Sequence, residues 1–179
     1  LCDYLRQLYF GLPAEYFELG CTETLMDRWQ CWPTEYIDRL LKSRTYGRAF
    51  GIKVMKPDVM IQQIMPLKFI RMIRQDLDAQ ARSWVKASKV NYFTDIGDPQ
   101  DRPPTDVEIT DEELEGAKAS LQDRSEVWDL QFSRTDVLTI SYEALVQDPK
   151  MVLTTVLEYL TDGKRKPVRV PTPLVQKLP

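Results

Sequence analysis

The stretch Lys68–Ile73, KFIRMI, decides the fold, together with Arg74-Gln75-Asp76 and the helical pattern that follows it to Val90. The residues 68–73 are mostly apolar over a length typical of a strand. Asp76 is a suitable N-cap, and the helix predicted over 76–90 has apolar or small residues at positions spaced for one face: Leu77, Ala81, Trp84, Val85 and Ala87. This segment therefore predicts a strand followed by a helix.

Two further strands are predicted, one on each side of this segment. Strands are predicted over 49–55, where Phe50, Ile52 and Val54 alternate with other residues, and over 136–141. Helices are predicted over 1–10, from Trp32-Pro33-Thr34, from the capping box that begins at Thr110 and from Asp148-Pro149. Strands separated by helices indicate an α/β fold, with a parallel sheet flanked by helices.

Length and composition limit the possible functions. The chain has 179 residues, a mass of 20.9 kDa and a net charge of -3. This length predicts one α/β domain, over 1–163, followed by an extended, basic, Pro-rich arm over 164–179. The charge argues against a nucleic-acid-binding protein, and the longest apolar runs are too short for a membrane span. With no histidine and three cysteines outside any C-x-x-C pattern, we expect no metal site and a reduced, cytoplasmic protein.

Ligands of parallel α/β folds bind at the carboxyl ends of the strands, and Arg74 stands at such an end. Its guanidinium can bind a phosphate in bidentate fashion, and the helix N-terminus that follows adds a positive dipole. Ser83, nine residues later in the predicted helix, can donate a hydroxyl to the same phosphate. The alternative is a surface arginine and a small serine that packs a helix.

Two further residues are candidates for chemistry. Lys53 lies within an apolar strand pattern, where an ammonium can stabilise a transferring anionic group; alternatively, the strand is an edge strand and Lys53 faces water. Glu15 lies between Pro13 and two aromatic residues, which can desolvate its carboxylate and make it a general base. The alternative for Glu15 is an exposed loop glutamate.

Five motifs occur in one order along the chain. They are Gly-x-Pro-x-Glu-Tyr-Phe (11–17), Phe-Gly-Ile-Lys (50–53), Arg-Gln-Asp-x(3)-Gln-Ala-x-Ser-Trp (74–84), Trp-x(3)-Phe (128–132) and Ser-Tyr-Glu-Ala-Leu (141–145). In this order the chain resembles the bacterial sulfotransferases typified by trehalose 2-sulfotransferase. More distantly it is similar to the superfamily that uses 3′-phosphoadenosine 5′-phosphosulfate.

This resemblance implies a P-loop-like α/β fold and transfer of a sulfuryl group to a hydroxyl of a small polar acceptor, such as a sugar or a glycolipid head group. Arg74 and Ser83 would bind the 3′-phosphate of the donor, 3′-phosphoadenosine 5′-phosphosulfate. Lys53 would be the active-site lysine and Glu15 the base, with no metal involved. The resemblance also implies a homodimer.

One motif of the family is absent from the sequence. The Arg-Ser-Gly-Ser-Thr-like loop that binds the 5′-phosphosulfate precedes the first helix in the family, and Leu1-Cys2 resembles the residues that follow it. We therefore expect the α/β domain to lack its N-terminal strand and this loop in the sequence shown. A non-catalytic sulfotransferase-like binding domain and a P-loop kinase are the alternative functions.

Overall fold

A pair of parallel strands organises the second half of the chain. The computed structural model describes residues 1–8, 10–17, 19–45, 49–55, 68–90, 106–132 and 136–164. The chain forms two units, one made of Leu1–Pro66 and Arg169–Pro179 and the other of Leu67–Val168. The prediction of one domain over 1–163 with an arm over 164–179 stays a prediction.

The sheet of the second unit consists, within the described residues, of β1 (Phe69–Ile73) and β2 (Val137–Ser141). The strands run parallel, from Phe69 opposite Val137 to Ile73 opposite Ser141. Both strands lie where the sequence predicts them. Their parallel pairing, connected through helices, confirms the α/β fold class.

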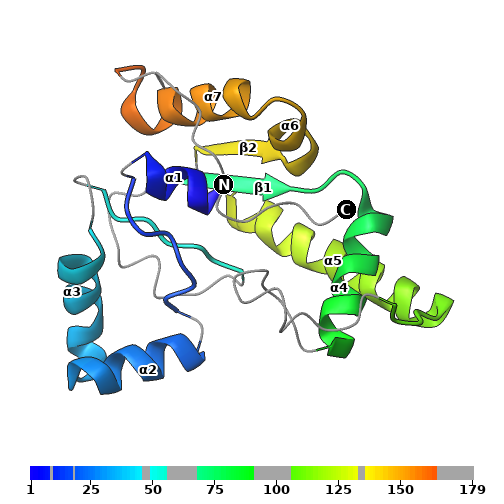
Figure 1. Ribbon diagram of the computed structural model, residues 1–179, viewed down its shortest axis with the longest axis horizontal. Helices are drawn as coiled ribbons and strands as arrows, with labels where there is room; N and C mark the ends of the chain where they lie inside the picture. The colour runs from blue at the N-terminus through cyan, green and yellow to red at the C-terminus, as the bar shows by residue number, and fades with distance from the viewer. Residues whose placement is uncertain are drawn as a thin grey trace. The chain divides into compact units, whose positions relative to one another are not determined.

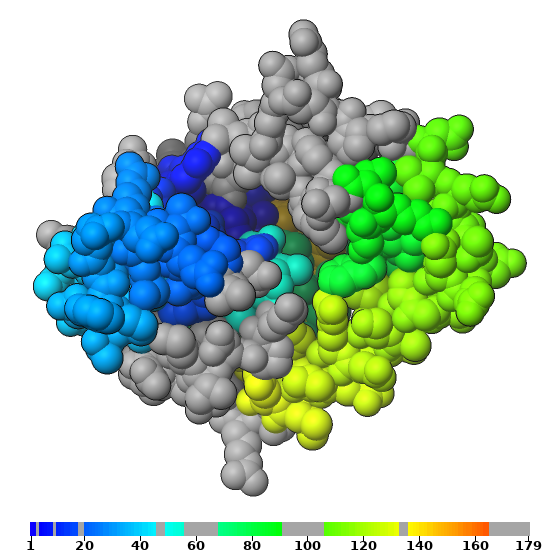
Figure 2. Space-filling model, turned by 90° about the horizontal axis from the view of Figure 1, so that it is seen from below, coloured from blue at the N-terminus to red at the C-terminus, as the bar shows by residue number. Residues whose placement is uncertain are grey.

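Between the two strands the described residues include two helices. The first, α4, spans Leu77–Val90, and α5 spans Asp111–Phe132. They pack against each other through four buried residues, Ala81, Val85, Leu114 and Ala117, and Figure 2 shows them side by side at the surface. Small side chains at this contact let the two helices approach closely.

The N-termini of both helices have the predicted caps. Asp76 Oδ1 accepts a hydrogen bond from Ala79 N–H at 2.8 Å. At the start of α5, Thr110 Oγ1 accepts from Glu113 N–H at 3.2 Å while the Glu113 carboxylate accepts from Thr110 N–H at 2.9 Å. Because these bonds form between residues three apart, the local sequence is sufficient to predict them.

The strand pair has helices on both sides. Figure 1 shows α7 (Pro149–Thr161) on one side and α5 on the other. On the α7 side, Leu153 and Val156 are fully buried. On the α5 side, the Phe69 and Phe132 rings lie 5.2 Å apart, and the Arg71 guanidinium pairs with Asp129. A short helix, α6 (Tyr142–Gln147), connects β2 to α7.

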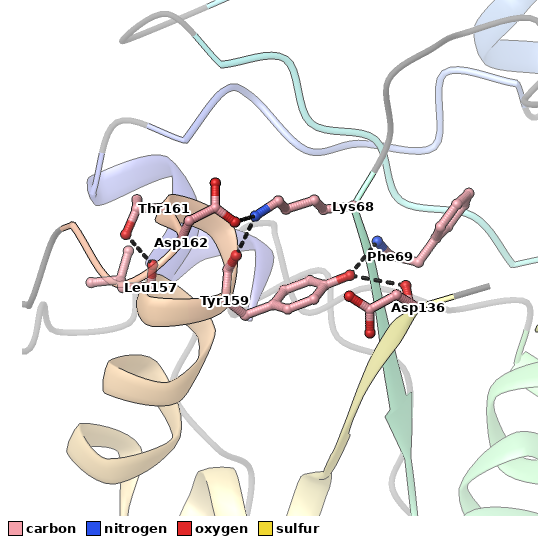
Figure 3. A network of polar contacts seen from close by, with 7 residues as sticks. All are labelled: Lys68, Phe69, Asp136, Leu157, Tyr159, Thr161 and Asp162. Atoms are coloured by element: carbon pink, nitrogen blue, oxygen red, sulfur yellow. Dashed lines mark hydrogen bonds and ion pairs between the residues drawn. The ribbon is translucent and has the colours of Figure 1, made fainter.

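Polar contacts at the amino ends of the strands attach α7 to the sheet (Figure 3). The Tyr159 hydroxyl accepts a hydrogen bond from Phe69 N–H at 3.2 Å and donates to the Asp136 carbonyl at 3.1 Å. The Lys68 ammonium donates to the Tyr159 carbonyl and pairs with Asp162, which ends α7 in the left-handed conformation. One tyrosine thus contacts the residues that begin both strands.

The first unit contains α1 (Cys2–Gln7), α2 (Leu19–Trp29) and α3 (Pro33–Arg44). Its core consists of Tyr16, Leu25, Tyr36 and Leu40, all of them nearly inaccessible to solvent. The Tyr36 hydroxyl donates to the Tyr16 carbonyl at 2.6 Å, so the one polar atom of this buried ring is satisfied.

The strand predicted over 49–55 is wrong. All seven residues are described, and they form no strand, although Lys53 N–H donates to the Ala14 carbonyl at 2.8 Å. The segment lies against Gly11–Ala14, and Pro13 in that stretch has no N–H with which to extend a ladder of hydrogen bonds. Alternating hydrophobicity was therefore not sufficient to predict a paired strand here.

Two helices, α2 and α6, occur where the sequence analysis placed no element. α6 is a short helix of six residues directly after β2, and α2 contributes Leu25 to the core of the first unit. The arm predicted over 164–179 lies, apart from residue 164, outside the described residues. Within the described residues, no helix has both the length and the apolar character needed to cross a bilayer.

Candidate active site

Arg74 stands directly after β1, in the three-residue connection to α4. Because Ile73 pairs with Ser141, Arg74 is next to the residue that follows β2, Tyr142. The guanidinium carbon lies 5.1 Å from the centre of the Tyr142 ring, within the range of a cation–π contact. Arg74 Nε is buried and has no hydrogen-bond partner, so one donor of a fixed guanidinium is unsatisfied.

Carboxylate side chains accept hydrogen bonds from the backbone N–H groups that follow Arg74. Glu143 accepts hydrogen bonds from the N–H groups of Gln75, at 3.1 and 3.2 Å, and Asp76, at 3.4 Å. The pKa of the Glu143 carboxyl lies below its ordinary value. The largest cause is a hydrogen bond from the N–H of Glu143 itself, and the bonds from Gln75 and Asp76 and the charge of Arg74 add to it. The cap from Asp76 uses a third amide, that of Ala79. At this end of α4 the guanidinium, rather than the helix dipole, is therefore the group available to an anion.

Ser83 lies on α4 with an exposed side chain. It stands two residues from both Ala81 and Val85, which pack against α5. Residues two apart on a helix point to nearly opposite sides, so Ser83 lies on the side of α4 that faces away from this contact. The structure thus places Ser83 in the same unit as Arg74 and leaves its hydroxyl accessible.

In the first unit, the structure brings together both residues predicted for chemistry. Lys53 Nζ lies 2.5 Å from Glu15 Oε1, and the two side chains are 45% and 37% exposed. The hydrogen bond from Lys53 N–H to the Ala14 carbonyl aligns the backbones that carry them. An ammonium and a carboxylate therefore form an ion pair that solvent still reaches.

Close backbone packing beneath this ion pair depends on glycine. Gly11 has φ of +80°, and a Cβ atom built on it would lie 2.5 Å from Gly51 N. A Cβ on Gly51 would in turn lie 2.9 Å from Pro13 Cγ. Side chains at either position would separate the two segments, because these distances are below any real contact. The glycines in the 11–17 and 50–53 motifs thus allow Glu15 and Lys53 to meet.

Tyr16, the neighbour of Glu15, anchors the pair to the core. Its ring is buried and stacks on Phe50 with centroids 6.2 Å apart, and its hydroxyl donates to the Leu12 carbonyl at 2.5 Å. Burial raises the pKa of the Tyr16 hydroxyl. The Arg44 guanidinium lies 6.0 Å from the centre of the same ring. Glu15 therefore projects from a segment that its neighbouring residue fixes in place.

The Cys2 thiol interacts electrostatically with both charges of this ion pair. Burial raises the pKa of the Cys2 thiol, while Lys53 opposes this shift and Glu15 adds to it. The thiol is therefore neutral at physiological pH, which makes it a poor nucleophile. Among the described residues, no group of three or more cysteine, aspartate and glutamate side chains gathers as metal ligands would.

Sequence reasoning did not identify the two residues that contact Arg74 and its connection, Tyr142 and Glu143. Both lie in the Ser-Tyr-Glu-Ala-Leu motif (141–145), which was noted only for its resemblance. The signal that would have found them is position, because they follow the strand that pairs with β1. Only the register of that pairing shows which residue of each strand end meets the other.

These features define an α/β protein with a cationic side chain at the end of a parallel strand and a separate carboxylate–ammonium pair. Over residues 58–178 the sequence matches the model of the Stf0 sulphotransferase family. The match covers more than half of the chain, so the chain belongs to the Stf0 sulphotransferase family, and the predicted resemblance is confirmed. No curated protein matches the sequence significantly.

Membership of this family identifies the chain as a transferase of sulfuryl groups that acts on a small molecule. Arg74 and Ser83 lie within the matched residues, as do both strands. Glu15 and Lys53 lie before residue 58, where the match begins. The roles of all four residues stay predictions.

Proposed function

We propose that the protein transfers a sulfuryl group from 3′-phosphoadenosine 5′-phosphosulfate to a hydroxyl of a small polar acceptor, such as a sugar or a glycolipid head group. The observation that carries this proposal is Arg74. Its guanidinium is supported by the Tyr142 ring, and its buried Nε has no partner. The 3′-phosphate distinguishes this donor from an ordinary 5′-nucleotide. An arginine at the carboxyl end of a parallel strand can bind such a phosphate through charge-assisted hydrogen bonds.

The energetics of Arg74 favour an anionic ligand. A buried polar group without a hydrogen bond costs about 1–3 kcal/mol. A phosphate oxygen that accepts from the guanidinium removes this penalty and adds a charge-assisted bond. Ser83 contributes a neutral hydroxyl, whose contact with the same phosphate is worth less.

In the proposed reaction Glu15 and Lys53 have separate roles. The donor, when bound, would supply the sulfuryl group: the acceptor oxygen bonds to sulfur as the bond from sulfur to the 5′-phosphate oxygen breaks, and adenosine 3′,5′-bisphosphate leaves. Glu15 accepts the proton of the acceptor hydroxyl, and its contact with Lys53 through Oε1 leaves the carboxylate oriented. Lys53 supplies positive charge to the oxygens on which negative charge increases in the transition state. Cytoplasmic location and a homodimer stay predictions.

The donor assignment is tested with Arg74→Ala in the intact protein. Calorimetry measures binding of adenosine 3′,5′-bisphosphate and of adenosine 5′-monophosphate. We expect the bisphosphate to lose about ten- to a hundredfold in affinity, the range of a charge-assisted bond worth about 1.5–3 kcal/mol. The monophosphate should change less than threefold.

The matched control is Arg82→Ala, which removes an exposed arginine from α4 and should affect both nucleotides alike. Equal losses for both nucleotides in Arg74→Ala would overturn the assignment. If the bisphosphate binds as expected but no sulfuryl transfer occurs to any hydroxyl acceptor, the protein is a non-catalytic relative.

A further inference from the structure

We infer that Glu143 is a positioning residue for the donor site: its carboxylate holds the connection between β1 and α4 and thereby orients Arg74. This inference rests on the proposed function of Arg74 and assigns a role that the reaction itself does not require of a carboxylate. The argument starts from the length of the connection. β1 ends at Ile73 and α4 begins at Leu77, so the conformation of the residues between them determines where the Arg74 side chain points.

The hydrogen bonds of the connection come from the neighbouring strand end. Within the connection, the amides of Gln75 and Asp76 precede the helix and donate to the Glu143 carboxylate at 3.1–3.4 Å. Without this carboxylate, both amides depend on water. Glu143 therefore provides the tertiary contact that fixes the backbone on the carboxyl side of Arg74.

Glu143 is itself fixed by the fold. Ser141, the last residue of β2, accepts a hydrogen bond from Ala144 N–H at 3.1 Å and caps α6. This cap sets the backbone of the two residues between them, Tyr142 and Glu143. The first supports the guanidinium from one side, and the second holds the backbone from which the guanidinium extends. Tyr142 and Glu143 thus orient the guanidinium of Arg74 and the backbone next to it, respectively.

The negative charge of Glu143 repels a phosphate, whereas the length of its side chain lets the carboxylate reach the amides that follow Arg74. These two effects predict opposite outcomes for two conservative variants. Glu143→Gln removes the charge but keeps an oxygen at the same distance from the Gln75 amide. Glu143→Asp keeps the charge but withdraws the carboxylate by one methylene, roughly 1.5 Å, which exceeds the tolerance of a hydrogen bond.

Binding of adenosine 3′,5′-bisphosphate and of adenosine 5′-monophosphate to the intact protein tests the inference. We expect Glu143→Asp to weaken the bisphosphate at least tenfold and the monophosphate less than threefold. Glu143→Gln should bind the bisphosphate within threefold of the unmodified protein. A loss of affinity in Glu143→Gln equal to that in Glu143→Asp would overturn the inference, as would no loss in Glu143→Asp. Glu126→Asp, on the exposed side of α5, is the matched control.

The double variant of Arg74→Ala and Glu143→Asp separates positioning from a general loss of structure. If Glu143 acts through Arg74, the double variant should bind the bisphosphate no more than twofold more weakly than Arg74→Ala alone. Multiplied losses would overturn the inference. If Arg74→Ala itself loses no bisphosphate affinity, the proposed function of Arg74 fails; a loss in Arg74→Ala without a loss in Glu143→Asp refutes the positioning role alone.

Discussion

Replacing Glu15 by glutamine separates a catalytic role of this side chain from a structural one. Glutamine keeps the size of the side chain and an oxygen for Lys53 but cannot accept the proton of an acceptor hydroxyl. Loss of a general base lowers rates by about 10²–10⁴-fold, which corresponds to about 3–5 kcal/mol of activation free energy. We therefore expect kcat to fall at least a hundredfold.

The structural contribution of the same side chain is much smaller. The ion pair with Lys53 is 45% and 37% exposed, and exposed pairs contribute about 0.2–1 kcal/mol to the free energy of unfolding. For a chain of 179 residues this is a shift in Tm of about 4 °C at most. Activity and stability thus respond on different scales, so one variant distinguishes the two roles.

The assay follows transfer of radiolabelled sulfate from the donor to a panel of hydroxyl acceptors, with thermal unfolding measured in parallel. Lys53→Met should also lower kcat while leaving donor affinity within a few-fold, because its interaction strengthens as charge develops. Glu23→Gln, an exposed glutamate of α2, and Lys42→Met, an exposed lysine of α3, are the matched controls. Turnover of Glu15→Gln within tenfold of the unmodified enzyme would refute the role of Glu15 as base.

Three further predictions concern the free energy of unfolding, measured by urea denaturation. Leu153→Ala, at a fully buried position of α7, should cost about 2–5 kcal/mol, whereas Leu130→Ala, 75% exposed on α5, should cost less than about 0.5 kcal/mol; similar values would refute the described core. Gly11→Ala should cost at least about 1–3 kcal/mol because of its positive φ, and a neutral effect would contradict that conformation. A hydrogen bond from Lys89 lowers the pKa of the Glu113 carboxyl below its ordinary 4.5; its stabilisation is present above pH 4.5 and is lost as the pH falls through the lowered pKa. Glu113→Gln should therefore flatten the loss of stability in acid, and an unchanged profile would contradict this ion pair.

Local signals in the sequence predicted most of the second unit. The caps at Asp76 and Thr110 and the helix start at Asp148-Pro149 each involve side chains within three residues of the amide they satisfy. Short-range hydrogen bonds of this kind form in the same way in any fold. Local composition also predicted β1 and β2, which are short and mostly apolar.

Local patterns failed where pairing decides the structure. Residues 49–55 alternate like a strand, but their neighbour is the Gly11–Ala14 segment, in which Pro13 offers no amide. Alternation shows that a backbone is extended; it does not show which segment lies beside it. The helix α6 was missed for a related reason, because its cap Ser141 is itself the last residue of β2, so no turn residue separates the strand from the helix.

By itself, the sequence determined which reactive side chains the protein contains. The absence of histidine leaves proton transfer to Asp, Glu, Lys, Tyr or Cys side chains, and the motifs around Glu15, Lys53, Arg74 and Ser83 established the family resemblance. Only the tertiary structure decided which of these groups meet. It paired Glu15 with Lys53 and brought Glu143 to the connection that carries Arg74. These contacts join residues far apart in the chain, and they depend on backbone packing at glycine and on strand register, neither of which a single stretch of sequence specifies.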